Sequence, residues 1–237
     1  MKKYSFLATV LIICFIGSVA ADEIDALIKQ LKSFKSTTRL AAAKELGEKR
    51  DPRAVNPLVS ALKSDRSWEV RLAAENSLVT IGSSAAEPLI VLIKEDKDCF
   101  VRRRSARALK GIKDPCSSEA LMKATVEDAD CCVRKFAARA LGEINDPKAV
   151  EFLDEAMKKK NLEIISAAYR YYVRKGDPRT EDVLTEAMQE SYYDKTMVLD
   201  VANCGNDRLR QAAEGIVKKR GYAIPTDWSG PKWGKVD

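Results

Sequence analysis

Apolar residues recur along this chain with the spacing of α-helices, and the predicted helices come in pairs. In the stretch VRLAAENSLVTI, Val70, Ala74, Leu78 and Ile81 are three or four residues apart, so they share one face of a helix. The same spacing continues through most of the chain. The pattern predicts helices at about 23–33 and 36–48, 52–63 and 67–81, 84–94 and 98–111, 115–125 and 130–143, 147–159 and 161–175, 178–189 and 192–204, and 206–220.

The helix pairs are copies of one repeat. Aligned on the arginine of a Val-Arg pair, the copies are separated by 32 residues (39 to 71), 31 (71 to 102) and 32 (102 to 134), and the first copy has Arg39 without the valine. A leucine follows seven residues after each arginine, at Leu46, Leu78, Leu109 and Leu141. A fixed period of this length is the signature of stacked helical repeats.

The turns between the helices have their own pattern. Aspartate is a good helix N-cap and proline suits the first helical turn, so each Asp-Pro pair predicts the start of a helix. Glycines near the predicted helix ends are expected to terminate helices in the left-handed conformation. The Asp-Pro pairs are Asp51-Pro52, Asp114-Pro115, Asp146-Pro147 and Asp177-Pro178, Asn206-Asp207 looks like a degraded copy, and the glycines are Gly47, Gly82, Gly111 and Gly142.

The repeat predicts how the chain divides. No single pair can bury its apolar face, so we expect residues 22–220 to form one all-α solenoid of about six helix pairs and a terminal helix. The tail, 221–237, contains Trp228 and Trp233 among glycines and prolines. It is expected to fold back over the exposed end of the solenoid, and the alternative is a docking peptide.

Residues 1–21 resemble a secretory signal peptide. Lys2 and Lys3 precede an apolar run at 6–16, and Ser18-Val19-Ala20 supplies small residues for cleavage after Ala20 or Ala21. We therefore expect a periplasmic or secreted protein with no membrane segment after cleavage; the alternative is an uncleaved anchor. Cleavage would lower the formal charge from +6 to +4, because the segment holds two lysines and no acid.

Composition narrows the function. The chain has no histidine, which excludes Ser-His-Asp and Cys-His nucleophiles and His-based zinc sites. Basic and acidic residues are interspersed, so the excess positive charge does not predict nucleic-acid binding. We expect no cofactor and no enzymatic activity.

Five cysteines remain after the signal segment, so at least one lacks a partner within the chain: Cys99, Cys116, Cys131, Cys132 and Cys204. Export would favour disulfides. Cys99 and Cys131 are repeat-equivalent, and stacked helices about 8–10 Å apart are too distant for a disulfide unless the loops lean together. A bond from Cys99 to Cys132, or to Cys131, is the open candidate. A metal site is not expected, because there is no C-x-x-C motif and no histidine.

The pattern D-x-x-V-R-x-x-A-A-x-A-L-G-x-I-x-D-P-x-A-V-x-x-L is similar to HEAT repeats, most closely to the short bacterial type named after the phycobilisome lyase subunits. The resemblance implies a right-handed superhelix with a ladder of aspartates and arginines between repeats. Ser33 and Lys159 depart from the ladder pattern, so we expect the ladder to fade at both ends. The implied ladder residues, which are structural rather than ligand-binding, are Asp65, Arg71, Asp96, Arg102, Asp128 and Arg134.

The resemblance also implies that the second helix of each pair lines a concave face where partners bind. Basic residues follow the ladder arginines by one and five positions, a helical turn apart. They predict a basic stripe for an acidic protein segment, an anionic glycan or a phosphate-bearing ligand; the alternative is an ordinary solvated face. The stripe consists of Arg103, Arg107, Lys135, Arg139 and Arg170.

These observations favour a non-enzymatic extracytoplasmic scaffold that binds another protein. The alternative is a lyase-like, chromophore-handling or thiol-dependent enzyme, by analogy with the phycobilin lyase subunits. Fold alone does not determine function. A signal peptide also argues against this alternative, because it predicts export, whereas the lyase chemistry is intracellular. An unpaired cysteine would be its only nucleophile.

Overall fold

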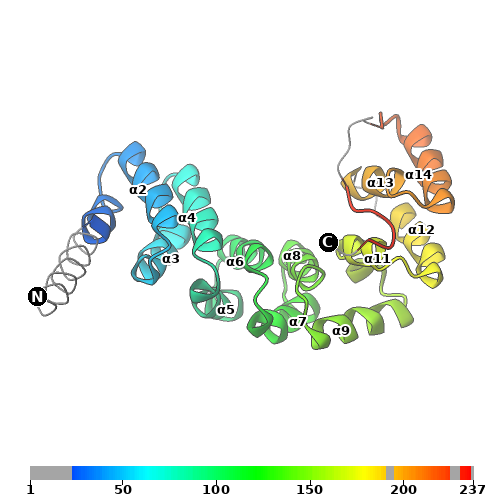
Figure 1. Cartoon of the computed structure of the whole chain (residues 1–237), viewed down its shortest axis with the longest axis horizontal. Helices are drawn as coiled ribbons and strands as arrows, with labels where there is room; N and C mark the ends of the chain where they lie inside the picture. Colours follow the sequence, from blue (N-terminus) through cyan, green and yellow to red (C-terminus); the bar gives the residue numbers. More distant parts are fainter. Residues whose placement is uncertain (1–22, 191–194, 225–229, 236–237) are drawn as a thin grey trace, which may run out of the picture. The chain divides into compact units, whose positions relative to one another are not determined.

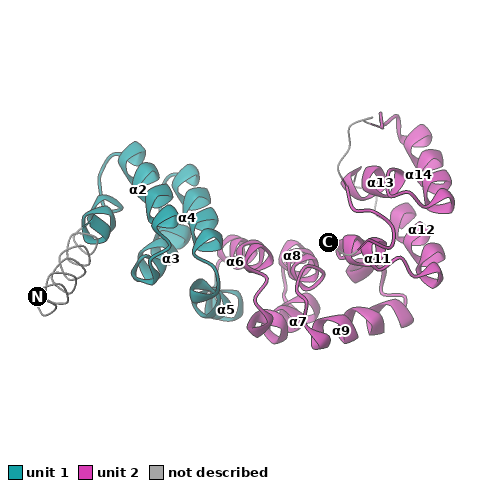
Figure 2. Cartoon of the chain, in the orientation of Figure 1, with its two compact units in different colours: residues 1–97 teal, residues 98–237 magenta. Residues whose placement is uncertain are grey.

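The computed structural model describes residues 23–190, 195–224 and 230–235, and all regular structure in them is helical (Figure 1). The chain divides into two compact units, Met1–Lys97 and Asp98–Asp237 (Figure 2). No helix in the described parts has the length and apolar character needed to cross a bilayer. The expected all-α repeat fold is confirmed, whereas the signal segment at 1–21 lies outside the described residues.

The first unit holds the earliest repeat copies. Residues 23–30 are helical, and the following helices pair as the sequence predicts. They are α2 (Ser36–Lys49), α3 (Val55–Ser64), α4 (Trp68–Ile81) and α5 (Ala86–Glu95).

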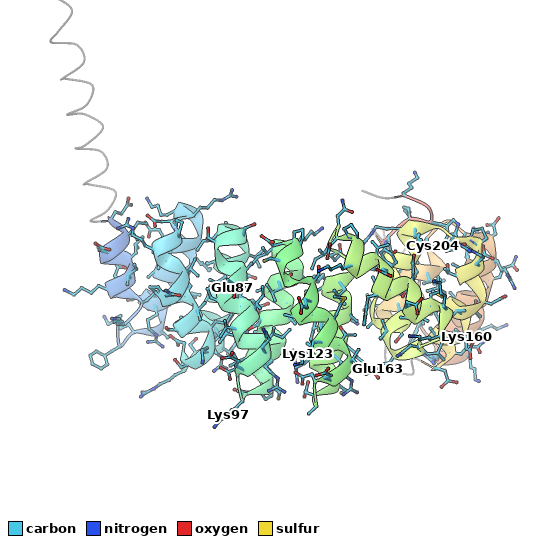
Figure 3. All side chains as sticks on the ribbon, turned by 90° about the horizontal axis from the view of Figure 1, so that it is seen from below. Glu87, Lys97, Lys123, Lys160, Glu163 and Cys204 are labelled. Carbon is cyan, nitrogen blue, oxygen red and sulfur yellow. The ribbon has the colours of Figure 1, made fainter. Side chains whose placement is uncertain are left out.

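The second unit contains the remaining copies and the candidate site. Its helices are α6 (Cys99–Ile112), α7 (Ser118–Glu127), α8 (Cys131–Leu141), α9 (Pro147–Lys158), α10 (Leu162–Ala167), α11 (Tyr169–Lys175), α12 (Glu181–Glu190), α13 (Lys195–Ala202) and α14 (Asp207–Arg220). Charged side chains such as Lys123, Lys160 and Glu163 are exposed (Figure 3), whereas Cys204 is buried after α13.

Most of the predicted caps form. Asp51, Asp114 and Asp177 each accept a hydrogen bond from the backbone N–H two residues on, and each begins a short 3₁₀ turn before its helix. Asn206 likewise accepts from the Leu209 N–H at 3.0 Å and begins α14. Asp146 begins α9 without a side-chain capping bond. The 3₁₀ turns explain why these first helices begin about three residues later than predicted.

The core follows the repeat. Leu46, Leu78, Leu109 and Leu141 are each at most 1% exposed, as expected for residues at one position of a stacked repeat. The small residues beside them are buried as well, so the helices within each unit can pack closely. These small residues include Ala73, Ala74, Ser105, Ala106, Ala137 and Ala138.

The interpretation of the glycines as left-handed helix ends is wrong at Gly47, Gly111 and Gly142. Gly111 lies inside α6, and the left-handed residue that ends this helix is Lys113. Gly47 lies inside α2, and a Cβ built there would be 2.5 Å from the Ser77 Oγ. Gly142 has a φ of −67°, and its Cβ would be 3.1 Å from the Tyr171 Cβ. Glycine is needed at positions 47 and 142 for close packing; the left-handed residue that ends α2 is Arg50.

The helix predicted over 161–175 is broken. It ends at Ala167 and restarts at Tyr169, with Ala168 at φ −94° and ψ 16°. The break adjoins a position where α6 and α8 have an alanine and this copy has Tyr169, which is 3% exposed. A buried tyrosine needs more room than an alanine, so a continuous helix at the same spacing could not accommodate it.

Residues 230–235 of the tail return to the second unit. The Trp233 N–H donates to the Cys204 carbonyl at 2.8 Å, and the Gly234 N–H donates to the Val173 carbonyl at 3.0 Å. A Cβ on Gly176 would be 2.4 Å from the Gly234 Cα. These contacts lie at the end of α11 and the turn after α13; Trp228 is outside the described residues. A role in covering the end of the solenoid stays a prediction.

Candidate anion-binding site

The five residues of the predicted basic stripe all lie in the second unit. Arg103 and Arg107 are on α6, Lys135 and Arg139 are on α8, and Arg170 is on α11. Arg107 and Lys135 are exposed, and the others are partly buried. The structure separates them into three environments.

Arg103 lies near the start of its helix. Its NH2 is 3.5 Å from an Asp130 carboxylate oxygen, and its guanidinium carbon is 4.9 Å from the centre of the Phe100 ring. Its buried Nε has no hydrogen-bond partner. The Asp130 carboxylate offsets part of the positive charge of Arg103, and the Phe100 ring attracts the guanidinium without adding a charge.

Arg107 and Arg139 are held together by an aromatic ring. Their guanidinium carbons lie 5.8 and 5.7 Å from the centre of the Phe136 ring, which belongs to α8. A ring face attracts cations without carrying a charge of its own. Phe136 thereby brings two arginines from neighbouring helices near one another.

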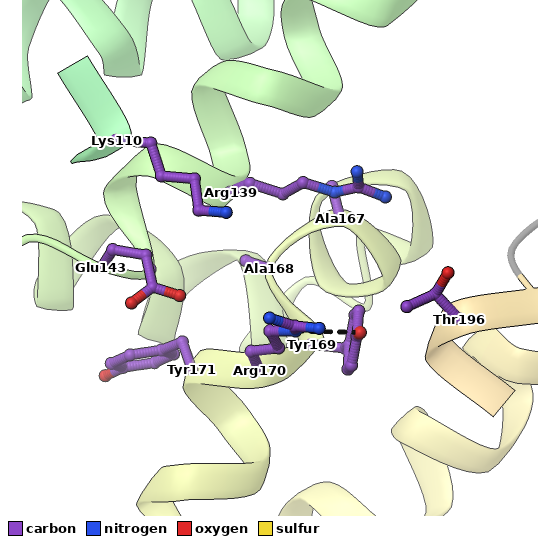
Figure 4. Close-up of a pocket in the computed structure, with 10 residues that line it drawn as sticks. Lys110, Arg139, Glu143, Ala167, Ala168, Tyr169, Arg170, Tyr171 and Thr196 are labelled. Carbon is purple, nitrogen blue, oxygen red and sulfur yellow. Dashed lines mark hydrogen bonds between the residues drawn. The ribbon is translucent and has the colours of Figure 1, made fainter. Parts of the chain in front are cut away.

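Next to these arginines, the second unit contains a cavity of about 150 Å³ (Figure 4). The Lys110 amine and the Arg170 guanidinium point into the same space, with Arg139 along one side and Thr196 of α13 on the far side. Glu143 is the one acidic residue in the lining. The lining consists of Lys110, Arg139, Gly142, Glu143, Ala167, Ala168, Tyr169, Arg170, Tyr171 and Thr196.

The environment of Lys110 disfavours its charge. Burial lowers the pKa of Lys110, and the positive charges of Arg170, Arg139 and Arg107 lower it further. Glu143 acts in the opposite direction without restoring the usual pKa. A desolvated lysine beside several arginines is the arrangement that a negatively charged group would stabilise.

Glu143 is already engaged by other cations. Its carboxylate is 3.3 Å from the Arg174 NH1 and 3.5 Å from the Lys113 Nζ. Arg174 also donates to the Gly142 carbonyl at 2.7 Å, which fixes it beside the glutamate. Since neither Arg174 nor Lys113 lines the cavity, the negative charge of Glu143 is compensated from outside it.

Arg170 is positioned by a buried acid. The Asp200 side chain on α13 is 0% exposed and accepts from the Arg170 Nε at 3.0 Å and NH2 at 2.9 Å. The Tyr169 hydroxyl donates to the same carboxylate. Burial and the Asp200 carboxylate raise the pKa of Tyr169, so the phenol stays protonated and keeps donating.

Sequence reasoning missed two members of this site. Lys110 follows Arg107 by three residues and therefore lies on the same side of α6, a signal that was present in the spacing. Asp200 had no such signal, because it lies 30 residues beyond Arg170. We use the name basic face for Arg107, Lys110, Lys135, Arg139 and Arg170 together.

The ladder residues lie outside the lining of this cavity, and two ion pairs join successive copies of the repeat. Arg39 contacts Asp65 at 2.7 Å, and Arg102 contacts Asp128 at 2.8 Å. Arg71 and Arg134 instead donate to the backbone carbonyls of Asp65 and Asp128, six residues before them. The third ladder carboxylate, Asp96, is 2.8 Å from the Lys63 Nζ.

The ladder does not fade at its N-terminal end. Arg39 pairs with Asp65, the aspartate of the following copy, so the serine at position 33 does not remove its partner. The Ser33 carbonyl also accepts a hydrogen bond from Arg39 at 2.8 Å. At the other end no aspartate is available in the next copy, and Arg134 is 3.0 Å from Glu163. This last pair is more exposed than the inner ones.

The disulfide considered between Cys99 and Cys132 does not form: within the part of the chain that the structure describes, both are free thiols. The Cys99 thiol hydrogen-bonds Asp130, next to Cys131 and Cys132. Burial raises the pKa of both Cys132 and Cys204, which disfavours reactive thiolates there. Within the described ranges, no three His, Cys, Asp or Glu side chains gather as metal ligands would.

The fold and this site define a helical-repeat solenoid with a basic cavity. The family model of HEAT repeats matches residues 24–110 and 118–198, so the chain belongs to the HEAT repeat family. No curated protein matches it.

Several solved structures resemble the chain at low identity. The complex of CpcE and CpcF of phycocyanin lyase from Nostoc sp. PCC7120 is 21% identical, with 84% of this chain and 77% of that chain covered and a TM-score of 0.44. A designed armadillo repeat protein in complex with the peptide (KR)4 is 20% identical, with 83% and 98% covered and a TM-score of 0.43. Human deoxyhypusine hydroxylase is 16% identical, with 82% and 83% covered and a TM-score of 0.33.

Proposed function

We propose that this protein is a non-enzymatic scaffold outside the cytoplasm, and that its basic face binds an acidic segment of another protein. The observation that carries the proposal is the convergence of Lys110, Arg139 and Arg170 on one cavity whose only acidic lining residue, Glu143, is engaged by other cations. Phe136 adds an apolar surface between two of the arginines. Arginine and aromatic side chains together are common anchors in protein interfaces.

The binding part of the proposal is tested with a defined probe. A fluorescent deca-glutamate peptide is titrated with the purified chain lacking residues 1–21, and its anisotropy is measured at low and high salt. The variant Arg107→Glu/Arg139→Glu should weaken binding by more than tenfold, because two attractive charges become repulsive. Added salt should weaken the wild-type complex, because exposed charges are screened.

A matched control carries the same change of charge elsewhere in the second unit. Lys123 on α7 and Lys148 on α9 are both exposed and lie outside the cavity lining. Lys123→Glu/Lys148→Glu should leave affinity within about twofold of wild type, as expected for weak long-range electrostatics. Equal losses in both double variants would mean that net charge alone attracts the peptide, and the basic face would then lose its role.

The location is tested separately. Residues 1–21 fused to alkaline phosphatase should direct the enzyme out of the cytoplasm, and N-terminal sequencing of the full chain after expression should begin at Ala21 or Asp22. A chain that retains Met1 in the cytoplasmic fraction would contradict export while leaving the binding proposal intact.

The enzymatic alternative gains no support from the site. Its candidate nucleophiles are thiols, and the pKa values of Cys132 and Cys204 are raised by burial. The described residues offer no histidine as a partner base, because the chain contains none. The scaffold is therefore the function that the geometry favours.

A further inference from the structure

We propose that the first unit contains a second docking site, a groove between the helix at 23–30 and α3 that takes up a bulky apolar side chain of a partner protein while carboxylates beside that side chain contact Lys32 and Arg66. The site is separate from the basic face, which lies wholly in the second unit. The shape of the groove, the exposure of Phe34 and the charges at the rim each support the inference.

The groove has a volume of about 620 Å³. Its lining comes from residues between 28 and 34, from Arg39 on α2, and from residues between 56 and 66. Ile28, Pro57 and Ala61 give it an apolar surface, and all three side chains are still partly exposed. Sites that enclose drug-sized ligands have roughly 300–1,000 Å³, so the groove admits a large side chain with part of its backbone rather than a single ion.

Phe34 belongs to the lining and is fully exposed. Its exposed fraction is 106%, whereas the other exposed large apolar side chains in the described parts of the chain reach at most 63%. An aromatic ring that continues an apolar groove is typical of an interaction site, because a partner would remove both from water. Phe34 is therefore placed to pack against a side chain that enters the groove.

The backbone that carries Phe34 is fixed before any partner binds. The Arg39 NH1 donates to the Ser33 carbonyl at 2.8 Å and to the Phe34 carbonyl at 3.1 Å. The same guanidinium donates to both carboxylate oxygens of Asp65, from Nε at 2.7 Å and from NH2 at 2.8 Å. Arg39 thus ties the turn at Phe34 to the end of α3, so little backbone order has to be gained on binding.

The charges at the groove favour an acidic partner. The lining contains three cations and one acid, and the acid, Asp65, is paired with Arg39. The other two cations, Lys32 and Arg66, are exposed, and their side chains form no hydrogen bond or ion pair within the residues that the structure describes. Carboxylates beside the docked side chain would therefore meet opposite charges at the rim.

Charge also argues against two other occupants. A second copy of the chain, docked symmetrically through this groove, would bring Lys32 and Arg66 of both copies together, and like charges at an interface are unfavourable. Residues 1–21 contain Lys2 and Lys3 and no acid, so they lack the opposite charge. A partner segment with a bulky apolar residue between acidic residues fits both the groove and its rim.

The test uses a fluorescent peptide, Glu-Glu-Leu-Trp-Glu-Glu, whose anisotropy is measured during titration with the full-length chain and with the chain lacking residues 1–21. Both forms should bind the peptide saturably. Replacing Leu-Trp by Ser-Ser in the peptide should weaken binding roughly tenfold, because the apolar contact is lost. Replacing the glutamates by lysines should weaken binding at least as much, because attraction becomes repulsion.

Two aromatic variants locate the apolar contact. Phe34→Ser should weaken binding roughly tenfold, and it should fold as wild type does because the ring is fully exposed. Trp68→Ser is the matched control, since Trp68 is an exposed aromatic residue of the same unit that lies outside the lining. It should leave affinity within about twofold of wild type.

Two double variants locate the charge contact. Lys32→Glu/Arg66→Glu should weaken binding roughly tenfold, because two attractive charges become repulsive. Lys44→Glu/Lys94→Glu makes a similar change at exposed lysines of the same unit outside the lining, and affinity should stay within about threefold.

The variant Arg107→Glu/Arg139→Glu separates the groove from the basic face, which also attracts glutamates. Affinity for the hexapeptide should stay within about threefold in this variant, because its changes lie in the other unit. If binding is lost there and kept in Phe34→Ser, the peptide binds the basic face, and the groove is overturned while the proposed function is supported. If the hexapeptide depends on Phe34 but deca-glutamate does not bind, the groove stands and the proposed function fails.

Three other outcomes overturn the groove as a docking site for an acidic partner. One is equal binding by Phe34→Ser and Trp68→Ser, or by the Leu-Trp and Ser-Ser peptides. Another is binding by the truncated chain alone, which would mean that residues 1–21 fill the groove. The third is a dimer in sedimentation velocity that dissociates in Phe34→Ser, which would identify a second copy as the occupant.

Discussion

The buried carboxylate of Asp200 gives the sharpest single test of how the site is built. It accepts the Tyr169 hydroxyl and two Arg170 nitrogens at 3.0 and 2.9 Å, and its own side chain is 0% exposed. Asp200→Asn keeps the size and removes the charge. All three bonds go to one carboxylate oxygen, Oδ2, so the amide oxygen of the variant can still accept them, but without the negative charge it attracts the Arg170 guanidinium less.

The expected cost follows from burial. Removing one partner of a fully buried ion pair costs about 3–5 kcal/mol. Arg170 is 43% exposed and can regain water when its partner is lost, so we expect a lower value, about 2–3 kcal/mol. Affinity for the deca-glutamate peptide should also fall several-fold, because a more weakly held Arg170 guanidinium has a less fixed orientation in the cavity.

The free energy of unfolding is measured by urea titration monitored by circular dichroism. The matched control is Asp154→Asn, because Asp154 pairs with Lys175 but both side chains are about one-third exposed, at 38% and 33%. Exposed pairs contribute about 0–1 kcal/mol, so this variant should lose less than about 1 kcal/mol. If the two variants lose the same stability, or if Asp200→Asn binds the deca-glutamate peptide as wild type does, Asp200 does not position Arg170.

Two further predictions concern the repeat itself. Gly47→Ala should destabilise the protein by about 2 kcal/mol, because the new Cβ would be 2.8 Å from the Ser77 Cα. Gly215→Ala in α14, where a Cβ would have nothing within 4 Å, should instead stabilise it by about 0.5–1 kcal/mol. Thermal melts in which both variants shift in the same direction would refute this. Burial opposes ionisation of Asp128, but hydrogen bonds from Arg102 and a backbone N–H outweigh it and lower the pKa. The stability that the ionised Asp128 contributes is present above its unfolded pKa of about 3.9 and is lost as the pH falls through its folded pKa. Urea titrations at pH 5 and pH 2 should therefore show that the free energy of unfolding falls by about 1 kcal/mol less in Arg102→Met than in wild type.

Local features of the chain could be predicted from the sequence. The Asp-Pro caps, the leucine at each repeat position and the bounds of most helices depend on residues within one or two turns of each other, so their physical chemistry is visible in the order of residues. Arg139 and Arg170 were likewise placed on the partner-facing side by their distance from the ladder position, and the structure brings both to one cavity.

Contacts between copies could not be predicted in this way. The glycine at position 47 was attributed to a helix end, but it is required by Ser77, 30 residues away in another helix. The ladder arginine at 39 pairs with an aspartate 26 residues later, so the register between copies decided its partner. Helical spacing describes one helix at a time and contains no information on which neighbour a face will meet.

The sequence by itself determined a repeated helix pair, its caps, its apolar face and the presence of basic residues at two regular positions. Only the tertiary structure decided which of those residues act together. Lys110, Arg170 and Asp200 come from three helices, α6, α11 and α13, spread over 90 residues. Packing within one unit brings Lys110 and Arg170 to the same cavity and Asp200 to Arg170. Electrostatic interactions depend on distance and solvent exposure, and both are fixed by packing rather than by position along the chain.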